Sequence, residues 1–475
     1  MKICFVASEC APFVKTGGLA DVRTGWWWNE PLSMNGGEVV VSGTGRFVAG
    51  CRSGSENGVA GYFGDGTVIF RDDAVFSAPR SNQTRLYVPA VRSGREQHLE
   101  MSFEDRAQVS MYGSLYVQCP MGVLSDAFRE TTVRVAFNSQ ATHSVRDLCI
   151  GGNLGLGEVN FNCGSLVVSN SLSLGFNDAF TGRSQSLDPK GVLSLNDGLL
   201  QVLGRFKTTD TKPYGLLVGN TLPLPSGSYK CLDIGLQGEL NVRDGALTNR
   251  NGLVLVGSGR GRGTVRQAGG EIASESQLPC LIGFLGGVGS YAMTGGTSRF
   301  SGDVYVGGAT LERLEWSKLT TTGSVGGETL DLATCHDAVG VLSVSNGTFR
   351  TDADVILSAD GVGTLELAAS GVVKAVNMRL ENGASTVRFK LDESGECGVS
   401  LDGCLTVSEG SKLVIDASDW DGQGRARRLF SCAEMDGVFS DADITVIGAR
   451  FTHRLRQTQS GVTFGPERGT MLILR

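Results

Sequence analysis

The chain has 475 residues, and 42 Lys and Arg stand against 49 Asp and Glu, which gives a formal net charge of −7. This mild negative charge, with no basic stripe, argues against a nucleic-acid partner. Glycine is abundant at 68 residues and proline is scarce at 11, a combination typical of short strands joined by tight turns. No apolar run approaches the ~18 residues of a membrane span, so we expect none.

The first 22 residues differ in pattern from the rest of the chain. Residues 1–8 predict a buried strand, residues 9–18 a loop of small residues, and residues 19–22 the start of a helix. The amphipathic helix does not continue, because three tryptophans at 26–28 and Pro31 follow instead. From residue 36 onward, β-branched runs between glycine and polar turns predict strands.

This N-terminal segment resembles the opening of the bacterial glycogen and starch synthases, which transfer glucose from ADP-glucose. The resemblance is carried by Lys2-Ile3, by residues 5–9 and 11–15, and by the run Thr16-Gly-Gly-Leu-Ala-Asp-Val22. It implies that Lys15 contacts the phosphates of ADP-glucose and that Gly17 and Gly18 let backbone amides approach them. A glycine-rich loop before a helix N-terminus is also a suitable anion site on physical grounds.

The resemblance covers only a small part of the chain. No alternation of strands and helices follows Val22, and the paired glutamates of the family's second domain have no counterpart. We therefore expect residues 1–22 to be a grafted fragment, either a genuine fusion or an assembly artefact. With no partner strands evident, the fragment is expected to contribute little to folding.

An internal repeat dominates the rest of the chain. Its template is Gly, any, apolar, any, apolar, any, any, Gly, as in Gly191-Val-Leu-Ser-Leu-Asn-Asp-Gly198. The template recurs with starts at 157, 191, 238, 263, 289, 340, 363 and 403, although Gln267 occupies an apolar position. The spacings cluster near about 25 residues, with two near twice that value as if a degenerate copy lay between.

A period of about 25 residues fits one coil of three short strands and three turns. The sequence therefore predicts an all-β fold, a right-handed parallel β-helix, or β-solenoid. An array of antiparallel hairpins is the rival, because Asp-Gly also marks hairpins. Alternation along the strands places the two apolar residues of each repeat inside; these are Leu193, Leu195, Leu240, Val242, Leu342, Val344, Leu405 and Val407.

Four regions follow from these patterns. Residues 1–22 are the synthase-like fragment, 23–150 an irregular β region, 151–410 the solenoid repeats, and 411–475 a C-terminal β cap. The cap is predicted from strand patterns at 412–416, 438–439, 444–447 and 471–474. The glycine-rich repeat is similar to those of autotransporter-type surface proteins. That resemblance implies an extracellular or cell-surface location, whereas the synthase alternative implies the cytoplasm.

Other candidate sites are weak. Asp416, Asp419 and Asp421 resemble a calcium loop without its closing Glu, and residues 257–263 resemble a loop between coils more than an anion cradle. The four histidines, His98, His143, His336 and His453, are not spaced for a metal pair, and no two cysteines form a CxxC pair. We identify no catalytic residue, no metal site and no cofactor.

Three functions remain open. The first is a non-enzymatic β-solenoid protein for adhesion, scaffolding or contact with glycans or other surface proteins. The second is an ADP-glucose-dependent glycosyltransferase that extends an α-1,4-glucan. The third is a β-helix enzyme acting on polysaccharides, which needs acids and bases clustered across coils.

Overall fold

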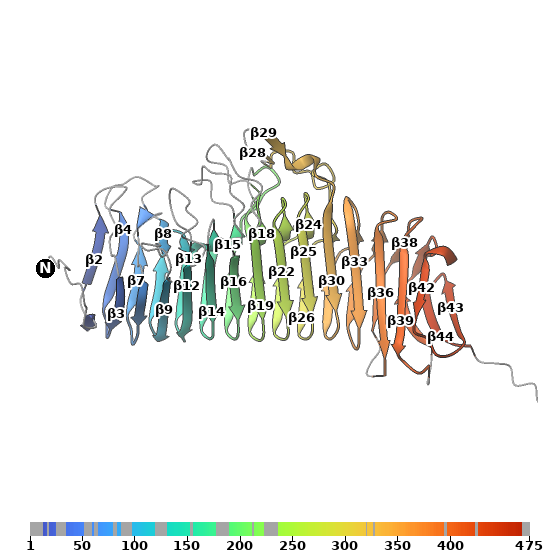
Figure 1. Cartoon of the computed structure of the whole chain (residues 1–475), viewed down its shortest axis with the longest axis horizontal. Coiled ribbons are helices and arrows are strands. Elements are labelled where there is room, and N and C mark those ends of the chain that lie inside the picture. The colour runs from blue at the N-terminus through green and yellow to red at the C-terminus, as the bar shows by residue number, and fades with distance from the viewer. Residues whose placement is uncertain are drawn as a thin grey trace, which may run out of the picture.

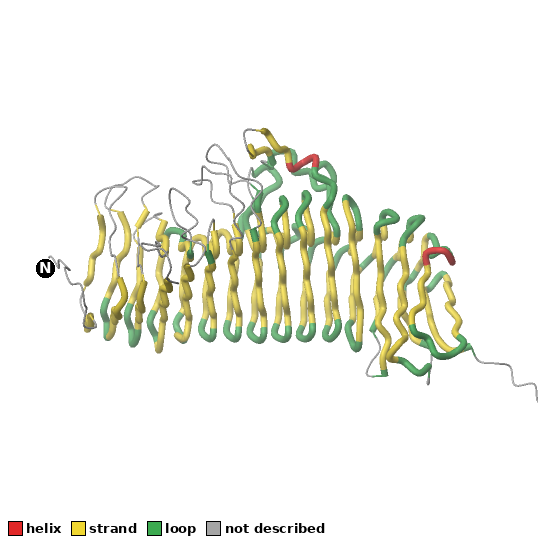
Figure 2. Tube along the Cα trace, in the orientation of Figure 1, coloured by secondary structure: helices red, strands yellow, loops and turns green. Residues whose placement is uncertain are grey.

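The computed structural model describes residues 13–16, 19–24, 35–51, 59–60, 65–78, 83–86, 97–118, 131–152, 155–176, 190–210, 213–222, 236–319, 321–325, 328–393, 397–422 and 426–467. The described chain is nearly all β, as predicted, and its helices are two single-turn 3-10 helices, Leu332–Thr334 and Asp441–Asp443 (Figure 2). Within these ranges no helix is long and apolar enough to cross a bilayer.

The first large sheet, sheet A, has fifteen strands. In spatial order they are β1 (Phe13–Thr16), β3 (Asn35–Ser42), β6 (Asp65–Phe70), β9 (Gln97–Asp105), β12 (Thr131–Ser139), β14 (Leu156–Phe161), β16 (Lys190–Leu195), β19 (Gln237–Val242), β22 (Arg262–Gln267), β25 (Val288–Met293), β30 (Ala338–Val344), β33 (Gly361–Ala368), β36 (Ser385–Asp392), β39 (Lys412–Asp419) and β42 (Ile444–Ile447).

The second large sheet runs as two rows, which the long strands β13 (Thr142–Gly152) and β15 (Ser165–Phe176) join. Row 1 contains β2 (Leu19–Thr24), β4 (Arg46–Cys51), β7 (Val75–Ala78), β10 (Gln108–Met111), β17 (Leu199–Val202), β20 (Ala246–Asn249), β23 (Glu271–Ser274), β26 (Thr297–Phe300), β31 (Thr348–Thr351), β34 (Val372–Ala375), β37 (Gly398–Leu401) and β40 (Arg427–Ser431).

Row 2 contains β5 (Val59–Ala60), β8 (Gln83–Leu86), β11 (Leu115–Val117), β18 (Gly215–Asn220), β21 (Leu253–Ser258), β24 (Cys280–Phe284), β27 (Val304–Val306), β32 (Val355–Leu357), β35 (Met378–Leu380), β38 (Cys404–Val407) and β41 (Glu434–Asp436). A small hairpin of β28 (Thr322–Val325) and β29 (Glu328–Asp331) lies outside the rows (Figure 1). The pair β43 (His453–Thr458) and β44 (Gly461–Pro466) follows at the far end.

Successive rungs of the chain, each with one strand in sheet A and one in each row, pair in parallel. Thus β19, β22 and β25 are neighbours in sheet A, β20, β23 and β26 in row 1, and β21, β24 and β27 in row 2. Among the described strands, antiparallel pairing is confined to β28–β29, β40–β44 and β43–β44. The rival prediction of a hairpin array is therefore wrong.

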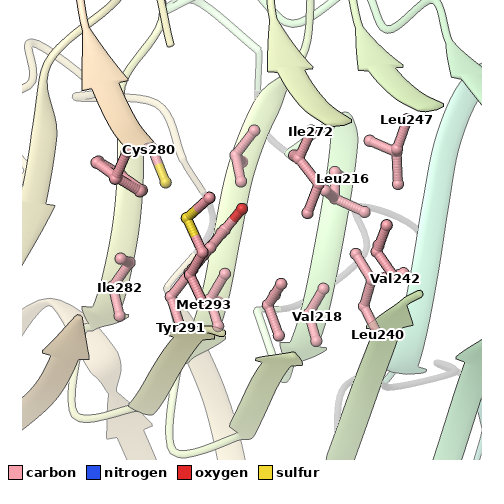
Figure 3. Close-up of a cluster of buried hydrophobic side chains, with 14 of the residues drawn as sticks. Leu216, Val218, Leu240, Val242, Leu247, Ile272, Cys280, Ile282, Tyr291 and Met293 are labelled. Atoms are coloured by element: carbon pink, nitrogen blue, oxygen red, sulfur yellow. The ribbon is translucent and has the colours of Figure 1, made fainter. Parts of the chain in front are cut away.

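The core lies between the sheets and is built from columns of like side chains, because register places each inward residue over its equivalent. In sheet A, Leu193, Leu240, Val265, Tyr291 and Leu342 form one such column. Figure 3 shows Leu240, Val242, Tyr291 and Met293 pointing at side chains from the two rows. All eight residues predicted to face inward are buried, with exposed fractions of 0–6%.

Two glycines in each repeat have separate structural reasons. A Cβ on the first glycine would meet the facing backbone, since at Gly263 it would lie 2.2 Å from both Gly257 N and Val218 O. The last glycine makes the turn out of sheet A, and Gly270 has φ +62°, in the left-handed region that glycine tolerates. The repeat template therefore records where two backbones touch and where the chain turns.

Stacked polar and aromatic side chains reinforce the rungs. Asn196 donates from Nδ2 to Asn162 Oδ1 at 2.7 Å, and Asn162 donates in the same way to Asn138 Oδ1 at 2.6 Å. Four inward phenylalanines of sheet A stack with centroid separations of 5.1–5.6 Å; they are Phe70, Phe103, Phe137 and Phe161. Ladders of identical residues are expected only where equivalent positions repeat in register.

Gln267, the polar residue at an apolar repeat position, is buried and fully engaged. Its Nε2 donates to the carbonyls of Gly270 and Thr297 at 3.2 and 2.9 Å. Its Oε1 accepts from the hydroxyls of Tyr291 at 3.2 Å and Ser298 at 2.5 Å. Burial of a polar group without partners costs free energy, so these bonds make glutamine acceptable in the core.

Two details of the predicted repeat are wrong. The longer spacings do not hide a degenerate copy, because Gly191 pairs directly with Gly238 and Gly289 pairs directly with Gly340. At the second of these, the additional residues 307–337 lie between β27 of row 2 and β30 of sheet A, and such an excursion costs little because loop-closure entropy grows slowly with length. The match at 403–410 belongs to β38 in row 2, while sheet A continues through β36 and β39.

The expected helix after Gly18 is also wrong. Residues Leu19–Thr24 form β2, which pairs in parallel with β4, and β1 pairs with β3. The N-terminal segment thus has partner strands, which we did not expect from its sequence. The expected junction between the synthase-like fragment and the rest of the chain, near Val22, lies inside strand β2. The strand expected at 1–8 lies outside the described residues.

At the C-terminal end the strands expected at 412–416 and 444–447 are present as β39 and β42. Residues 438–439 are not a strand, and 471–474 lie outside the described residues. Trp420, buried, contacts Phe451 and Phe464 with ring centroids 5.1 and 6.1 Å away. The boundaries of the four regions stay a prediction.

Candidate functional site

The outer surface of row 2 carries a second apolar cluster, separate from the core between the sheets. Its outward positions on successive rungs are Leu217, Leu255, Leu281, Tyr305 and Ile356, all nearly fully buried. An apolar stripe on an outer face must be covered to be buried.

The covering segment is residues 309–337, called the cover here, which leaves the stack between β27 and β30 (Figure 1). Trp316, Leu319 and Leu332 of the cover join the outer apolar cluster. The Trp316 ring lies edge-on to Phe284 and to Phe206, with centroids 5.8 and 5.2 Å apart. The cover is therefore held by hydrophobic contact with the outer face.

An arginine fixes the edge of the cover that faces the C-terminal end of the stack. Arg313 Nη2 donates to Glu381 Oε1 at 2.7 Å, its Nη1 donates to the other carboxylate oxygen, and its guanidinium lies 5.4 Å from the Tyr305 ring centroid. The bond with Glu381 raises the pKa of Arg313, and burial raises the pKa of Tyr305. Two-point pairing of this kind holds geometry as well as charge.

Beyond this edge, the same face opens into a polar groove. Two neighbouring strands of row 2 line it with three outward positions each, and its volume is about 530 Å³. The lining residues are Asn377, Arg379, Glu381, Cys404, Thr406 and Ser408. Arg379 and Thr406 are register partners, so the side chains that β35 and β38 contribute lie next to each other.

The acids at the polar groove are engaged. Asp354 Oδ2 accepts from Arg379 at 2.8 Å and its Oδ1 accepts from Asn377 at 2.7 Å, while Glu381 is held by Arg313. Asn377 Oδ1 accepts in turn from the backbone N–H of Cys404 at 2.8 Å. A general acid needs a carboxyl group free to exchange a proton with substrate, and neither of these carboxylates is free. The lining offers donors and acceptors in fixed places, which suits binding.

Of the three predicted nucleotide-sugar residues, only Lys15 lies within the described strands, and its role stays a prediction. Lys15 lies in β1, where its Cα partner is Val41. Gly17 and Gly18 lie outside the described residues, and their role stays a prediction. The residues that follow them form β2, so the helix N-terminus invoked for anion binding is not there.

The weaker motifs serve the fold. Hydrogen bonding from the Ser418 hydroxyl lowers the pKa of Asp416, and Asp416 Oδ1 also accepts from the Ser418 N–H at 3.2 Å. Asp419 pairs with Lys390 at 2.9 Å. Within residues 257–263, a Cβ at Gly263 would lie 2.2 Å from Gly257 N, so the two glycines mark a close approach of backbones. No group of three or more His, Cys, Asp or Glu in the described ranges is arranged for a metal ion.

The histidines and cysteines of the described ranges show no shared site. His143 is buried in the core, and its Nδ1 accepts from the Val109 N–H at 3.1 Å. His336 pairs with Asp360 at 2.7 Å on the surface. The described cysteines that are free thiols are Cys149, Cys163, Cys280, Cys335, Cys397, Cys404 and Cys432.

Sequence reasoning did not find the polar groove. Its lining comes from two strands 27 or so residues apart along the chain, at outward positions where polar side chains are ordinary. The register of β35 against β38 makes these six residues neighbours, and the groove is open because the cover does not extend over them. The only feature of the sequence that could have pointed to this lining is that its residues occupy outward positions of the strands.

Comparison with known proteins finds similarity at the N-terminus. Residues 2–26 match the model of the starch synthase catalytic domain. A glycogen synthase of Roseobacter denitrificans is 91% identical over 22 residues, which is 5% of this chain and 5% of that protein. The chain thus matches a twentieth of the length of this relative. No solved structure matches the chain.

Proposed function

We propose that this chain is a non-enzymatic β-solenoid protein of the surface or extracellular kind, and that its polar groove contacts glycans. The observation that carries the proposal is the polar groove itself, in which six outward side chains of two adjacent strands offer donors and acceptors while the neighbouring carboxylates are bound to arginines. Sugar hydroxyls both donate and accept hydrogen bonds, so they match such a lining.

The solenoid itself is a right-handed parallel β-helix in this proposal. Parallel pairing of equivalent strands on successive rungs supports it, and so do the asparagine and phenylalanine ladders. Right-handedness follows from the general preference of parallel crossover connections. Gly238, Gly263 and Gly289 are successive register partners, which supports a period of about 25 residues in the regular part.

The ends of the stack act as caps in this proposal. At the C-terminal end, β44 pairs antiparallel with β40 and β43, which departs from the parallel order of the rungs. Trp420, Phe451 and Phe464 pack there over the last apolar residues of the core. A terminal unit that changes pairing direction protects an open sheet edge from adding further strands.

The glycosyltransferase alternative has one observation in its favour, the match of the first residues to glycogen synthase. Transition-state binding in a two-domain transferase requires groups from both walls of a cleft. The match supplies a fragment of one wall, and part of that fragment forms β1 and β2. A polysaccharide-cleaving enzyme is likewise less well supported, because the acids at the polar groove are paired.

The test is glycan binding by purified full-length chain and by the variant Arg379→Ala. Immobilised neutral oligosaccharides of α-1,4-glucose, β-1,4-glucose and N-acetylglucosamine serve as probes, and we expect at least one to bind. Loss of the Arg379 donors should weaken that binding about tenfold to a hundredfold, the usual worth of one hydrogen bond from a charged group.

The matched control is Arg388→Ala, since Arg388 is also an exposed arginine that pairs with an acid, Glu366 at 3.9 Å, but lies on sheet A. Binding to none of the probes, or equal loss in both variants, would contradict the proposed site. Transfer of glucose from ADP-glucose by the purified chain would contradict the non-enzymatic assignment.

A further inference from the structure

Three basic residues lie directly above one another on the outer face of row 1. Arg299 on β26, Arg350 on β31 and Lys374 on β34 are register partners on consecutive rungs. The side chains of Arg299 and Arg350 are 61% and 54% exposed, and Lys374 is exposed as well. Neighbouring strands lie about 4.8 Å apart, so like charges face each other at close range.

This arrangement is unfavourable for the fold alone, because like charges directly opposite on adjacent strands destabilise a sheet. Asp352 relieves part of the repulsion, since its Oδ2 accepts from Arg299 at 2.8 Å and its Oδ1 accepts from Arg350 at 2.9 Å. Lys374 forms no ion pair with any residue that the structure describes. Within the described ranges, the basic ladder of these three residues therefore ends in a cation without an ion-pair partner.

Sheet A of the same molecule shows the opposite pattern. There Arg134 lies between Glu100 and Glu158 on neighbouring strands and pairs with them at 3.8 and 2.6 Å. Lys190 pairs with Glu239 of the next strand at 3.1 Å. The charges named on sheet A alternate and neutralise one another, whereas Arg299, Arg350 and Lys374 on row 1 repeat the same sign on consecutive rungs, with Asp352 beside the two arginines.

The basic ladder borders a second groove, of about 420 Å³. Its walls are Arg350, Thr351, Asp352, Lys374, Ala375, Val376, Ser400 and Asp402. The cations lie on the rungs of β31 and β34, and Ser400 is the partner of Lys374 on the next rung. Val376, 36% exposed, adds an apolar contact on the same wall.

We infer that this second groove binds a polysaccharide bearing acidic groups, which places one of them between Arg350 and Lys374. The inference rests on the proposed function in that both ligands are glycans, but it concerns a different face and a different chemistry. A carboxylate or sulfate there accepts hydrogen bonds from a guanidinium and an ammonium at once, which are the strong, charge-assisted kind.

The experiment measures binding of the full-length chain to three soluble probes at low ionic strength. Oligogalacturonate supplies carboxylates, a heparin oligosaccharide supplies sulfates, and an α-1,4-glucan oligosaccharide supplies neither. The two acidic arms distinguish the source of the anion. We expect at least one acidic probe to bind more tightly than the neutral one and to lose affinity as salt is added.

The decisive variant is Lys374→Glu, and the matched control is Lys412→Glu, which makes the same charge change at an exposed lysine on sheet A. We expect acidic-probe binding to weaken at least tenfold in the first variant and less than twofold in the second. Equal losses in the two variants, no loss in either, or tighter binding of a single-stranded oligonucleotide of equal charge would overturn the inference.

Failure of the inference is separable from failure of the proposed function. Neutral oligosaccharide binding that depends on Arg379, together with no preference for acidic probes, would remove the basic-ladder site alone. Binding of acidic probes that depends on Lys374, without any neutral binding at the polar groove, would remove the polar-groove proposal alone.

Discussion

Replacement of Gly263 by alanine should destabilise the stack strongly, although alanine is the smallest possible change. The added Cβ would lie 2.2 Å from Gly257 N and 2.2 Å from Val218 O, and both atoms belong to backbone. Ordinary van der Waals contact would require each to retreat by about 1 Å, on strands β21 and β18 that pair with their neighbours.

Overpacking of a well-packed core costs about 1–3 kcal/mol when side chains can adjust. Here backbone has to move, so we expect about 3 kcal/mol or more, on the order of a hundredfold in the folded-to-unfolded ratio. Urea denaturation followed by circular dichroism measures the change, with the slope of the transition as a check that the unfolding unit is the same.

Gly383→Ala is the matched control, because the nearest atom to a Cβ at Gly383 is 3.6 Å away, an ordinary contact. It should change the free energy of unfolding by less than about 0.5 kcal/mol, as surface substitutions usually do. If Gly263→Ala proved as mild as Gly383→Ala, the argument that the first glycine of the repeat marks a backbone-to-backbone contact would be refuted.

Two further predictions concern buried polar groups. Gln267→Leu removes the Oε1 acceptor of the Tyr291 and Ser298 hydroxyls and the Nε2 donor to the carbonyls of Gly270 and Thr297, so it should cost about 1–3 kcal/mol in urea unfolding; an unchanged midpoint would mean that the network is not satisfied as described. Burial lowers the pKa of His143 from 6.5 to about 4, so the unfolded chain binds the proton more readily and stability falls as pH drops from 6.5 towards 4. The loss amounts to about 3 kcal/mol, and urea unfolding at pH 7.5 and 4.5 should show a smaller difference in His143→Leu than in the parent chain, whereas equal differences would contradict the assignment.

The sequence predicted the core better than the surface, because core positions follow from patterns within one strand whereas surface sites depend on residues far apart in the chain. Alternation of Leu193 and Leu195 along one strand is a local pattern, and its repetition at Leu240 and Val242 reports that the strands stack. The last glycine of each repeat is equally local, as Gly245 with φ +75° illustrates. Such features need no knowledge of the rest of the chain.

The candidate sites could not be predicted in this way. The neighbours Arg379 and Thr406 come from different rungs, and the length of each rung varies with excursions whose size the repeat does not reveal. The outward apolar positions are buried as far as Ile356 and the polar groove stays open beyond them, which depends on how the cover packs. Non-local contacts of this kind are set jointly by the register of the strands and by the lengths of the segments that connect them.

The prediction for the N-terminus was wrong for the opposite reason, because it relied on local sequence alone. Local sequence resembled a synthase so closely that a helix was expected at Leu19, yet β2 pairs with β4 across six residues. A segment rich in small and β-branched residues can join an available parallel edge, because tertiary pairing overrides weak helix propensity. Sequence similarity over 22 residues therefore does not carry the relative's local structure with it.

The most direct test of the stacked architecture is a set of distances along sheet A. Nitroxide labels on introduced unnatural residues leave the native cysteines in place, and suitable outward positions are Ala136, Ser194, Ser343 and Arg388. Register places four steps between Ser194 and Ser343, six between Ser194 and Arg388, and eight between Ala136 and Arg388.

At about 4.8 Å per step, electron–electron resonance should report backbone separations of about 19, 29 and 38 Å, which rise evenly by about 10 Å. Label arms add a common offset but leave the increments unchanged. Separations that fail to rise in this order, or that double where the chain makes its long excursions, would contradict the continuous stack of rungs on which both proposed binding sites depend.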